Sequence, residues 1–160
     1  KADLFSSIHT NANRVRGMNG FEVYYVSPSV NDSQRALYSA QNASLNLQNA
    51  LFSSPSVNLK AILWDMVYTA SRAESIELAH SICKSINKNL DVEVLGVKGA
   101  RYFVLKGARI PAVLVEVGFV SNSTEERFLK NYYYREKIAD SIHEGVLNYA
   151  RESGMMQAKK

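Results

Sequence analysis

The apolar and polar positions of the chain predict strands that alternate with long helices. Residues 4–9, 21–26 and 111–117 are rich in β-branched and aromatic side chains and are bounded by polar or glycine-containing sequence, which predicts three strands. The third is a continuous apolar segment, as expected of a strand that is covered on both faces. Weaker strand patterns occupy residues 92–97 and 102–105.

Between the second and the later strands, apolar residues recur at three- and four-residue spacing, which is typical of helices. We expect one helix to begin at Asn31 or Asp32 and to end near residue 51. A second helix is predicted over about residues 58–86. Within it, the capping-box pattern Ser71-x-x-Glu74 indicates a break or a second helix start.

The C-terminal part of the chain predicts a short helix, with a Ser123-x-x-Glu126 capping box, and then a long closing helix. Strands that alternate with helices indicate an α/β domain with a mostly parallel or mixed sheet flanked by helices. We assign residues 1–152 to one domain and residues 153–160 to a flexible tail. The expected core face of the closing helix consists of Ile138, Ile142, Val146 and Tyr149.

Composition narrows the class of protein. With 160 residues, 46% of them hydrophobic and 21% charged, the chain is long enough to form one domain with a core. No apolar run is long enough for a transmembrane segment. The net charge of +4 is spread along the chain, so we expect no nucleic-acid partner. Cys83 is the only cysteine, which excludes an intramolecular disulfide, and its helical spacing predicts a buried position.

His9 is a candidate metal ligand, because it lies where an apolar strand gives way to a polar loop. At that edge of an open α/β sheet a side chain can point into a crevice, and neutral imidazole is a common metal ligand. The alternative is a histidine that only satisfies a hydrogen bond at a strand end. The pattern alone favours this second interpretation.

Glu116 interrupts an apolar segment near the end of the strongest predicted strand. A buried carboxylate is costly unless it has a partner, so such a residue is normally paired, bound to a metal or catalytic. A low-dielectric environment would also raise its pKa towards the range that suits a general base. A salt bridge to Arg101 or Arg109 is the structural alternative.

Other polar residues are weaker candidates. Strict alternation in its strand lets Glu22 face solvent, and His80 and His143 occupy helical patterns in which we expect surface positions. The three consecutive tyrosines of residues 132–134 could line a sugar-binding groove, although aromatic residues at a helix start more often pack. The serines lack the G-x-S-x-G context of a serine hydrolase.

Two motifs stand out along the chain: one runs from Asp3 to Ala12 and continues at Gly20 to Tyr25, and the other runs from Ile110 to Asn122. They resemble the "ADLFISIHANA … GFETYY" and "IPSVLVETGFISN" stretches of the zinc-dependent N-acetylmuramoyl-L-alanine amidases. The likeness extends from Lys1 to about Tyr149, with several motifs in the same order.

This resemblance implies an α/β fold and a zinc ion held by two histidines and a glutamate, with a coordination position left for water. His9 matches the second histidine, and Glu116 matches the glutamate that accepts the proton of the zinc-bound water. The first histidine and the glutamate ligand of the family precede the point at which this chain begins. The resemblance therefore implies that the first strand or strands of the fold are missing from this chain and that its zinc site is incomplete.

The family's reaction is cleavage of the amide between the lactyl group of N-acetylmuramic acid and the L-alanine of the stem peptide. The resemblance implies a peptidoglycan hydrolase of the periplasm or the cell exterior, in cell-wall remodelling or daughter-cell separation, whose signal peptide is not in this chain. In some relatives an inserted helix blocks the site until an activator protein binds. Residues 42–51 could form such a helix, although a sheet-covering helix fits their pattern better.

Two competing hypotheses remain. One is a non-catalytic fragment of the same fold that binds the wall or a partner, and the other is a zinc peptidase of the same fold that cleaves within the stem peptide. Zinc content separates the first from the amidase, because only the enzyme needs the missing ligands. Product masses separate the second.

Overall fold

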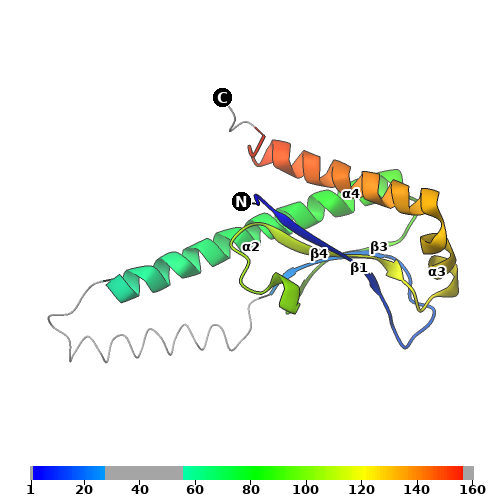
Figure 1. Ribbon diagram of the computed structural model, residues 1–160, viewed down its shortest axis with the longest axis horizontal. Coiled ribbons are helices and arrows are strands. Elements are labelled where there is room, and N and C mark those ends of the chain that lie inside the picture. The colour runs from blue at the N-terminus through cyan, green and yellow to red at the C-terminus, as the bar shows by residue number, and fades with distance from the viewer. Residues whose placement is uncertain (1, 28–55, 157–160) are drawn as a thin grey trace.

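The computed structural model describes residues 2–27 and 56–156, the second range with side chains from residue 66 onward. Its strands form one mixed sheet in the order β1-β4-β2-β3 (Figure 1). β1 pairs with β4 and β2 pairs with β3 in parallel, whereas β2 and β4 are antiparallel. The predicted mixed α/β fold is confirmed. The strands are β1 (Phe5–Asn11), β2 (Phe21–Val26), β3 (Val94–Ala100) and β4 (Ala112–Phe119).

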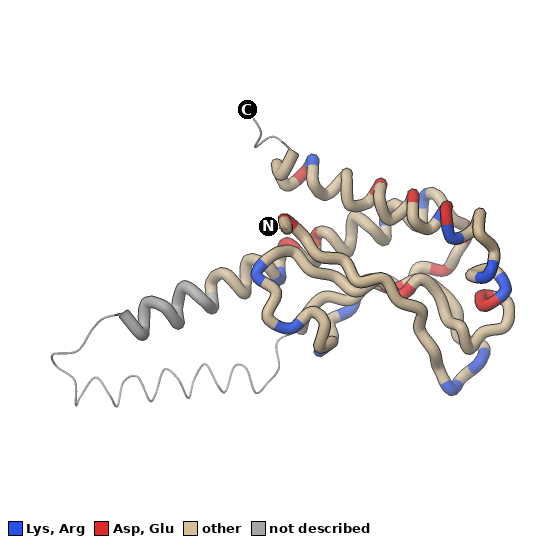
Figure 2. Tube along the Cα trace, viewed as in Figure 1, with Lys and Arg blue, Asp and Glu red and all other residues tan. Residues whose placement is uncertain are grey.

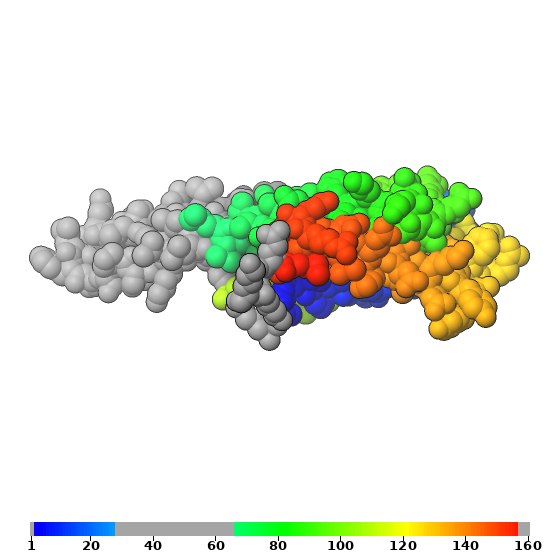
Figure 3. Space-filling model, turned by 90° about the horizontal axis from the view of Figure 1, so that it is seen from above, coloured from blue at the N-terminus to red at the C-terminus, as the bar shows by residue number. Residues whose placement is uncertain are grey.

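Two long helices, α2 (Ser56–Asn89) and α4 (Tyr132–Glu152), lie side by side on one face of this sheet (Figures 1 and 3). The short helix α3 (Ser123–Lys130) joins β4 to α4, and the 3₁₀ helix η1 (Phe103–Leu105) packs on the opposite face. In the described part of the chain, no helix is long and apolar enough to cross a membrane.

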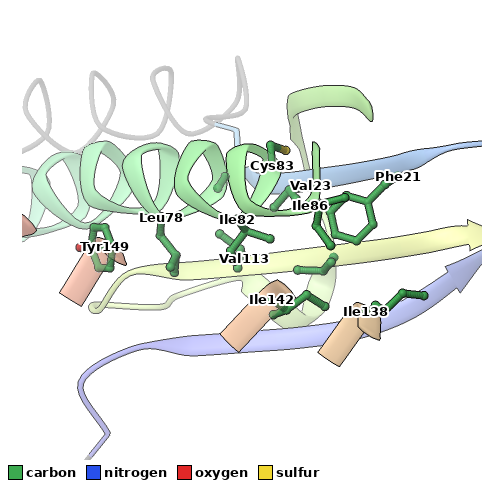
Figure 4. Packing of buried hydrophobic residues seen from close by; sticks show 12 residues of the cluster. Phe21, Val23, Leu78, Ile82, Cys83, Ile86, Val113, Ile138, Ile142 and Tyr149 are labelled. Carbon is green, nitrogen blue, oxygen red and sulfur yellow. The ribbon is translucent and has the colours of Figure 1, made fainter. Parts of the chain in front are cut away.

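The main core fills the space between the sheet and the two long helices (Figure 4). Burial of such side chains contributes about 1.5–3 kcal/mol each. Every second residue of β2 and β4 faces this core, because successive side chains of a strand point to opposite faces. Cys83 is buried here, as predicted. The contributing side chains include Phe21 and Val23 of β2, Val113 and Val115 of β4, Leu78, Ile82 and Ile86 of α2, and Ile138, Ile142 and Tyr149 of α4.

Most predicted strands agree with the observed ones. β2 has the predicted bounds, and β1 continues two residues beyond His9. β4 is apolar on both faces, since Val113 and Val115 contact the main core while Leu114 belongs to a second cluster on the other face. This second cluster comprises Val26, Leu105, Ala112 and Leu114, with Tyr24, Tyr68, Tyr102 and Ala108 packed against it.

The predicted strand over residues 102–105 is wrong, because this segment forms η1. Leu105 is fully buried, but Phe103 is 88% exposed and Val104 is 45% exposed, so one side chain anchors the turn. Gly107, at φ +80°, then reverses the chain with a conformation that other residues rarely adopt.

Two predicted capping boxes are also wrong. α2 runs through Ser71 without a break, and Ser75 donates its hydroxyl hydrogen to the Ser71 carbonyl and accepts a hydrogen bond of 2.9 Å from the amide of Ala112. These serines connect α2 to β4 instead of starting a helix. The cap of α3 is Asn122 and not Ser123, since the Asn122 side chain accepts hydrogen bonds from the amides of Thr124 and Glu125.

Some predictions fall on parts of the chain outside the described residues. These are the helix predicted to begin at Asn31 or Asp32, the blocking role of residues 42–51, and residues 157–160 of the predicted tail. Residues 153–156 turn back on the end of α4, where the Ser153 amide donates to the Tyr149 carbonyl at 2.9 Å.

Candidate active site

Three polar residues form a row across neighbouring strands on the sheet face opposite α2 and α4. His9 of β1 is the register partner of Glu116 of β4, and Glu116 is also the partner of Glu22 of β2. Directly opposed residues of paired strands project from the same face. That face is the one away from the main core, because Glu116 alternates with Val115, which packs against the helices. The fold thus brings the two predicted site residues together and adds a second carboxylate.

Glu116 is buried, with 6% of its surface exposed, and its Oε2 atom has no hydrogen-bond partner among the described residues. Burial raises the pKa of its carboxyl group, the nearby His9 lowers it, and the neighbouring Glu22 raises it again. The structural alternative, a salt bridge to Arg101 or Arg109, is not among the ion pairs of the described residues. A buried oxygen without a partner is costly, and it is characteristic of a group that has a task beyond packing.

His9 is exposed at the edge strand, beside Glu116. Its Nε2 atom lies 2.8 Å from the Ser7 hydroxyl oxygen, which limits the rotation of the imidazole ring. Metal-binding histidines are commonly oriented by a hydrogen bond at the ring nitrogen that does not bind the metal. His80 and His143 are exposed on the helices, as predicted. Among the described residues, no three histidine, cysteine or acidic side chains lie together in a group that could hold a metal ion.

Glu22 does not face solvent as predicted, because only 2% of its surface is exposed. Its Oε1 atom accepts hydrogen bonds of 2.8 Å from the Asn11 side-chain amide and from the Tyr24 hydroxyl, and its Oε2 atom accepts one from Lys98 Nζ. A signal for this burial was present in the sequence: Val26 shares the Glu22 face of β2, so at least part of that face had to be covered.

Two tyrosines line the row on the β3 side. The rings of Tyr24 and Tyr102 meet edge to face, with centroids 5.0 Å apart. Burial raises the pKa of both hydroxyl groups, and the charge of Glu116 raises that of Tyr102 further. Sequence patterns did not single out either residue. Tyr102 is distant from the site motifs in the sequence, and only the fold brings its loop to the site.

A groove of about 720 Å³ lies between β1 and α4. Its lining is mostly apolar, with Ile8, Val117 and Ile138 among the contributing side chains, and His9 lies at it together with His143. Figure 3 shows β1 in blue next to α4 in orange on this side of the molecule. The groove does not include Glu116 or Glu22, so it neighbours the polar row without containing it.

The three consecutive tyrosines mark the start of α4. Tyr132 and Tyr133 are 62% and 73% exposed and contact each other edge to face, whereas Tyr134 packs against the main core. Packing thus accounts for the third of them, and the sugar-groove interpretation remains a prediction for the first two.

Comparison with known proteins supplies the family. The family model described as N-acetylmuramoyl-L-alanine amidase matches residues 1–148. The chain belongs to this amidase family. Its relatives include AmiC of Escherichia coli O6:H1, which is 34% identical over 93% of this chain, LytC of Bacillus subtilis, which is 32% identical over 94%, and AmiA of Escherichia coli K12, which is 32% identical over 92%.

The amidase-family chain spans only part of these relatives, namely 36% of AmiC, 22% of LytC and 52% of AmiA. Solved structures agree on the fold. AmiC2 of Nostoc punctiforme matches with a TM-score of 0.60 at 25% identity, over 94% of this chain and 59% of that one. An N-acetylmuramoyl-L-alanine amidase from Clostridium difficile 630 matches with a TM-score of 0.63 at 22% identity, over 99% of this chain and 60% of that one.

Proposed function

We propose that this chain contributes to the catalytic domain of a zinc-dependent amidase that cleaves the bond between the lactyl group of N-acetylmuramic acid and the L-alanine of the stem peptide. Family membership supports the reaction class. The observation that carries the proposal is Glu116, a buried carboxylate with one unpartnered oxygen directly beside His9. Amide hydrolysis needs a base at such a position, and an imidazole next to it is suited to hold a metal.

Glu116 would act as general base and then as general acid. Its burial raises its pKa above that of a carboxyl group in water, so it binds a proton more strongly and still exchanges it. It would accept the proton of the attacking water and later donate it to the amino group of the leaving L-alanine.

Zinc, when bound, lowers the pKa of a water molecule and polarises the scissile carbonyl. His9 would be one of its ligands, held in orientation by Ser7. Zinc enzymes of this type use three protein ligands. The described residues offer no group of three, so a histidine and a glutamate from outside them would complete the set.

The substrate is then peptidoglycan, and an enzyme that acts on it works in the periplasm or outside the cell. Remodelling of the wall or separation of daughter cells are the corresponding roles. An activator protein is a further element of the proposal; the CwlD amidase of Clostridioides difficile, a structural neighbour, was solved in complex with the GerS lipoprotein. The zinc peptidase and the non-catalytic wall-binding fragment remain the competing functions.

Parallel measurements of zinc content and amidase activity test this assignment in a protein that includes the histidine and glutamate proposed to complete the zinc site. We expect His9→Ala to lose both zinc and activity, and Glu116→Gln to keep zinc but lose activity about 10²–10⁴-fold, the contribution of a general base. His80→Ala, at an exposed histidine on α2, is the matched control and should change neither quantity. Full zinc binding by His9→Ala, or full activity of Glu116→Gln, would contradict the assigned roles.

A further inference from the structure

The Glu22 carboxylate lies at the centre of a hydrogen-bonded network that has no role in the chemistry assigned so far. It is almost fully buried, and each of its oxygens accepts hydrogen bonds from named donors: Asn11 and Tyr24 at Oε1, and Lys98 at Oε2. A buried charge satisfied in this way is held in one geometry. Glu22 thus differs from Glu116 beside it, one of whose oxygens lacks a partner among the described residues.

The contact between Asn11 and Glu22 crosses the strand that carries the candidate base. β4 lies between β1 and β2 in the sheet, so the two backbones are about 10 Å apart, which is two strand spacings. The side chains of Asn11 and Glu22 close this distance to a hydrogen bond of 2.8 Å. They meet above β4, next to the row that contains Glu116.

Asn11 also fixes the end of β1 just after His9. The pairing of β1 with β4 shifts in register between His9 and Asn11. After this irregularity, the Asn11 carbonyl accepts a hydrogen bond of 2.9 Å from the Val120 amide, and its side-chain oxygen accepts one of 2.8 Å from the Ala12 amide. Asn11 is therefore the residue at which the strand regains its partner, two positions beyond the candidate ligand.

We propose that Glu22 is a positioning residue of the amidase site, which holds Asn11 across β4 and so fixes the end of β1 that presents His9 to Glu116. This inference rests on the proposed function. It makes Glu22 and Asn11 one unit, in which Tyr24 donates to the same carboxylate oxygen as Asn11. Lys98 contacts the other oxygen and compensates the buried charge. A purely structural ion pair between Glu22 and Lys98 would not involve His9.

The test compares Glu22→Met, which removes both carboxylate oxygens, with Asn11→Ala, the double variant and Lys98→Met in the zinc-loaded protein. Zinc affinity is measured by competition with a chelator, alongside kcat and KM on peptidoglycan. Loss of an outer partner of a metal ligand typically costs 10–100-fold in metal affinity or activity. We expect Glu22→Met and Asn11→Ala each to weaken zinc binding about 10-fold and to lower kcat with little change in KM.

Non-additivity distinguishes positioning from general destabilisation. If Glu22 acts through Asn11, the double variant should bind zinc no more weakly than Glu22→Met alone. Lys98→Met removes the ion pair but leaves the Asn11 contact, so it should lower the melting temperature and leave zinc affinity within about twofold. Should Glu22→Met fail to fold, Asn11→Ala, at a partly exposed residue, still carries the test.

The imidazole resonances of the zinc-free protein give a second readout, with His80 as the internal reference. Those of His9 should shift in Glu22→Met and Asn11→Ala, and stay unchanged in Lys98→Met. Equal zinc affinity, kcat and His9 resonances in Glu22→Met and wild type would overturn the positioning role alone. A wild-type protein that neither binds zinc nor releases stem peptides would overturn the proposed function, and this inference with it.

Discussion

At the scale of single residues, Glu116 should make the zinc-free protein less stable than it could be. Burial raises the pKa of its carboxyl group, so the folded protein binds this proton more tightly than the unfolded chain does. The free energy of unfolding therefore falls as pH rises through the interval between the unfolded and the folded pKa. Above that interval the penalty is complete.

Glu116→Gln removes this penalty. We expect the zinc-free variant to be more stable than wild type at pH 7, because a neutral amide costs less to bury than a carboxylate charge. The difference should disappear near pH 4, where the glutamate of the unfolded chain is largely protonated as well. Urea unfolding at both pH values checks this. A loss of stability at pH 7, or a gain independent of pH, would contradict the account.

At the scale of secondary-structure elements, the N-cap of α3 is Asn122, whereas the sequence pattern predicted Ser123. Asn122→Ala should reduce the free energy of unfolding by about 1 kcal/mol, because two amides of the first turn lose their acceptor. Ser123→Ala is the control and should have an effect within about 0.5 kcal/mol, as is typical of exposed positions. The reverse order of effects, measured by denaturant unfolding, would restore the predicted cap.

The contact between α2 and α4 depends on Gly145. A Cβ atom at this position would lie 2.6 Å from Ile82 Cα and 3.0 Å from Ile82 N, closer than packed atoms approach, and the Gly145 carbonyl accepts a hydrogen bond from Ser81. Gly145→Ala should therefore destabilise the protein by about 1–3 kcal/mol or more through overpacking. Gly17→Ala, with no atom within 4 Å of the added Cβ, should leave stability nearly unchanged. Equal unfolding midpoints of the two variants would show that the helices can separate without cost.

At the scale of the whole molecule, sequence periodicity predicted those strands whose burial pattern is visible in the order of apolar and polar residues. The apolar segment of β4 and the alternation in β2 left little choice, whereas the residues of η1 have strand-like composition but only one buried side chain, Leu105. A local pattern cannot distinguish a strand from this 3₁₀ helix, because a segment forms a strand only where the fold offers a neighbouring strand to pair with.

The same limit of local patterns explains why the candidate site was predicted only in part. His9 and Glu116 lie in motifs that the sequence displays, but their adjacency and the burial of Glu22 follow from the strand order, which places β4 between β1 and β2. Figure 2 shows that acidic and basic residues are interspersed along the described chain.

The masses of the products released from purified peptidoglycan test the central claim most directly. The account predicts free stem peptides that begin with the amino group of L-alanine and glycan strands whose lactyl carboxyl groups are free, with neither product formed by Glu116→Gln at equal zinc content. Fragments cut within the stem peptide while the lactyl amide stays intact would contradict it and identify a peptidase. Intact peptidoglycan after incubation with the zinc-loaded protein would contradict it as well and favour a wall-binding fragment.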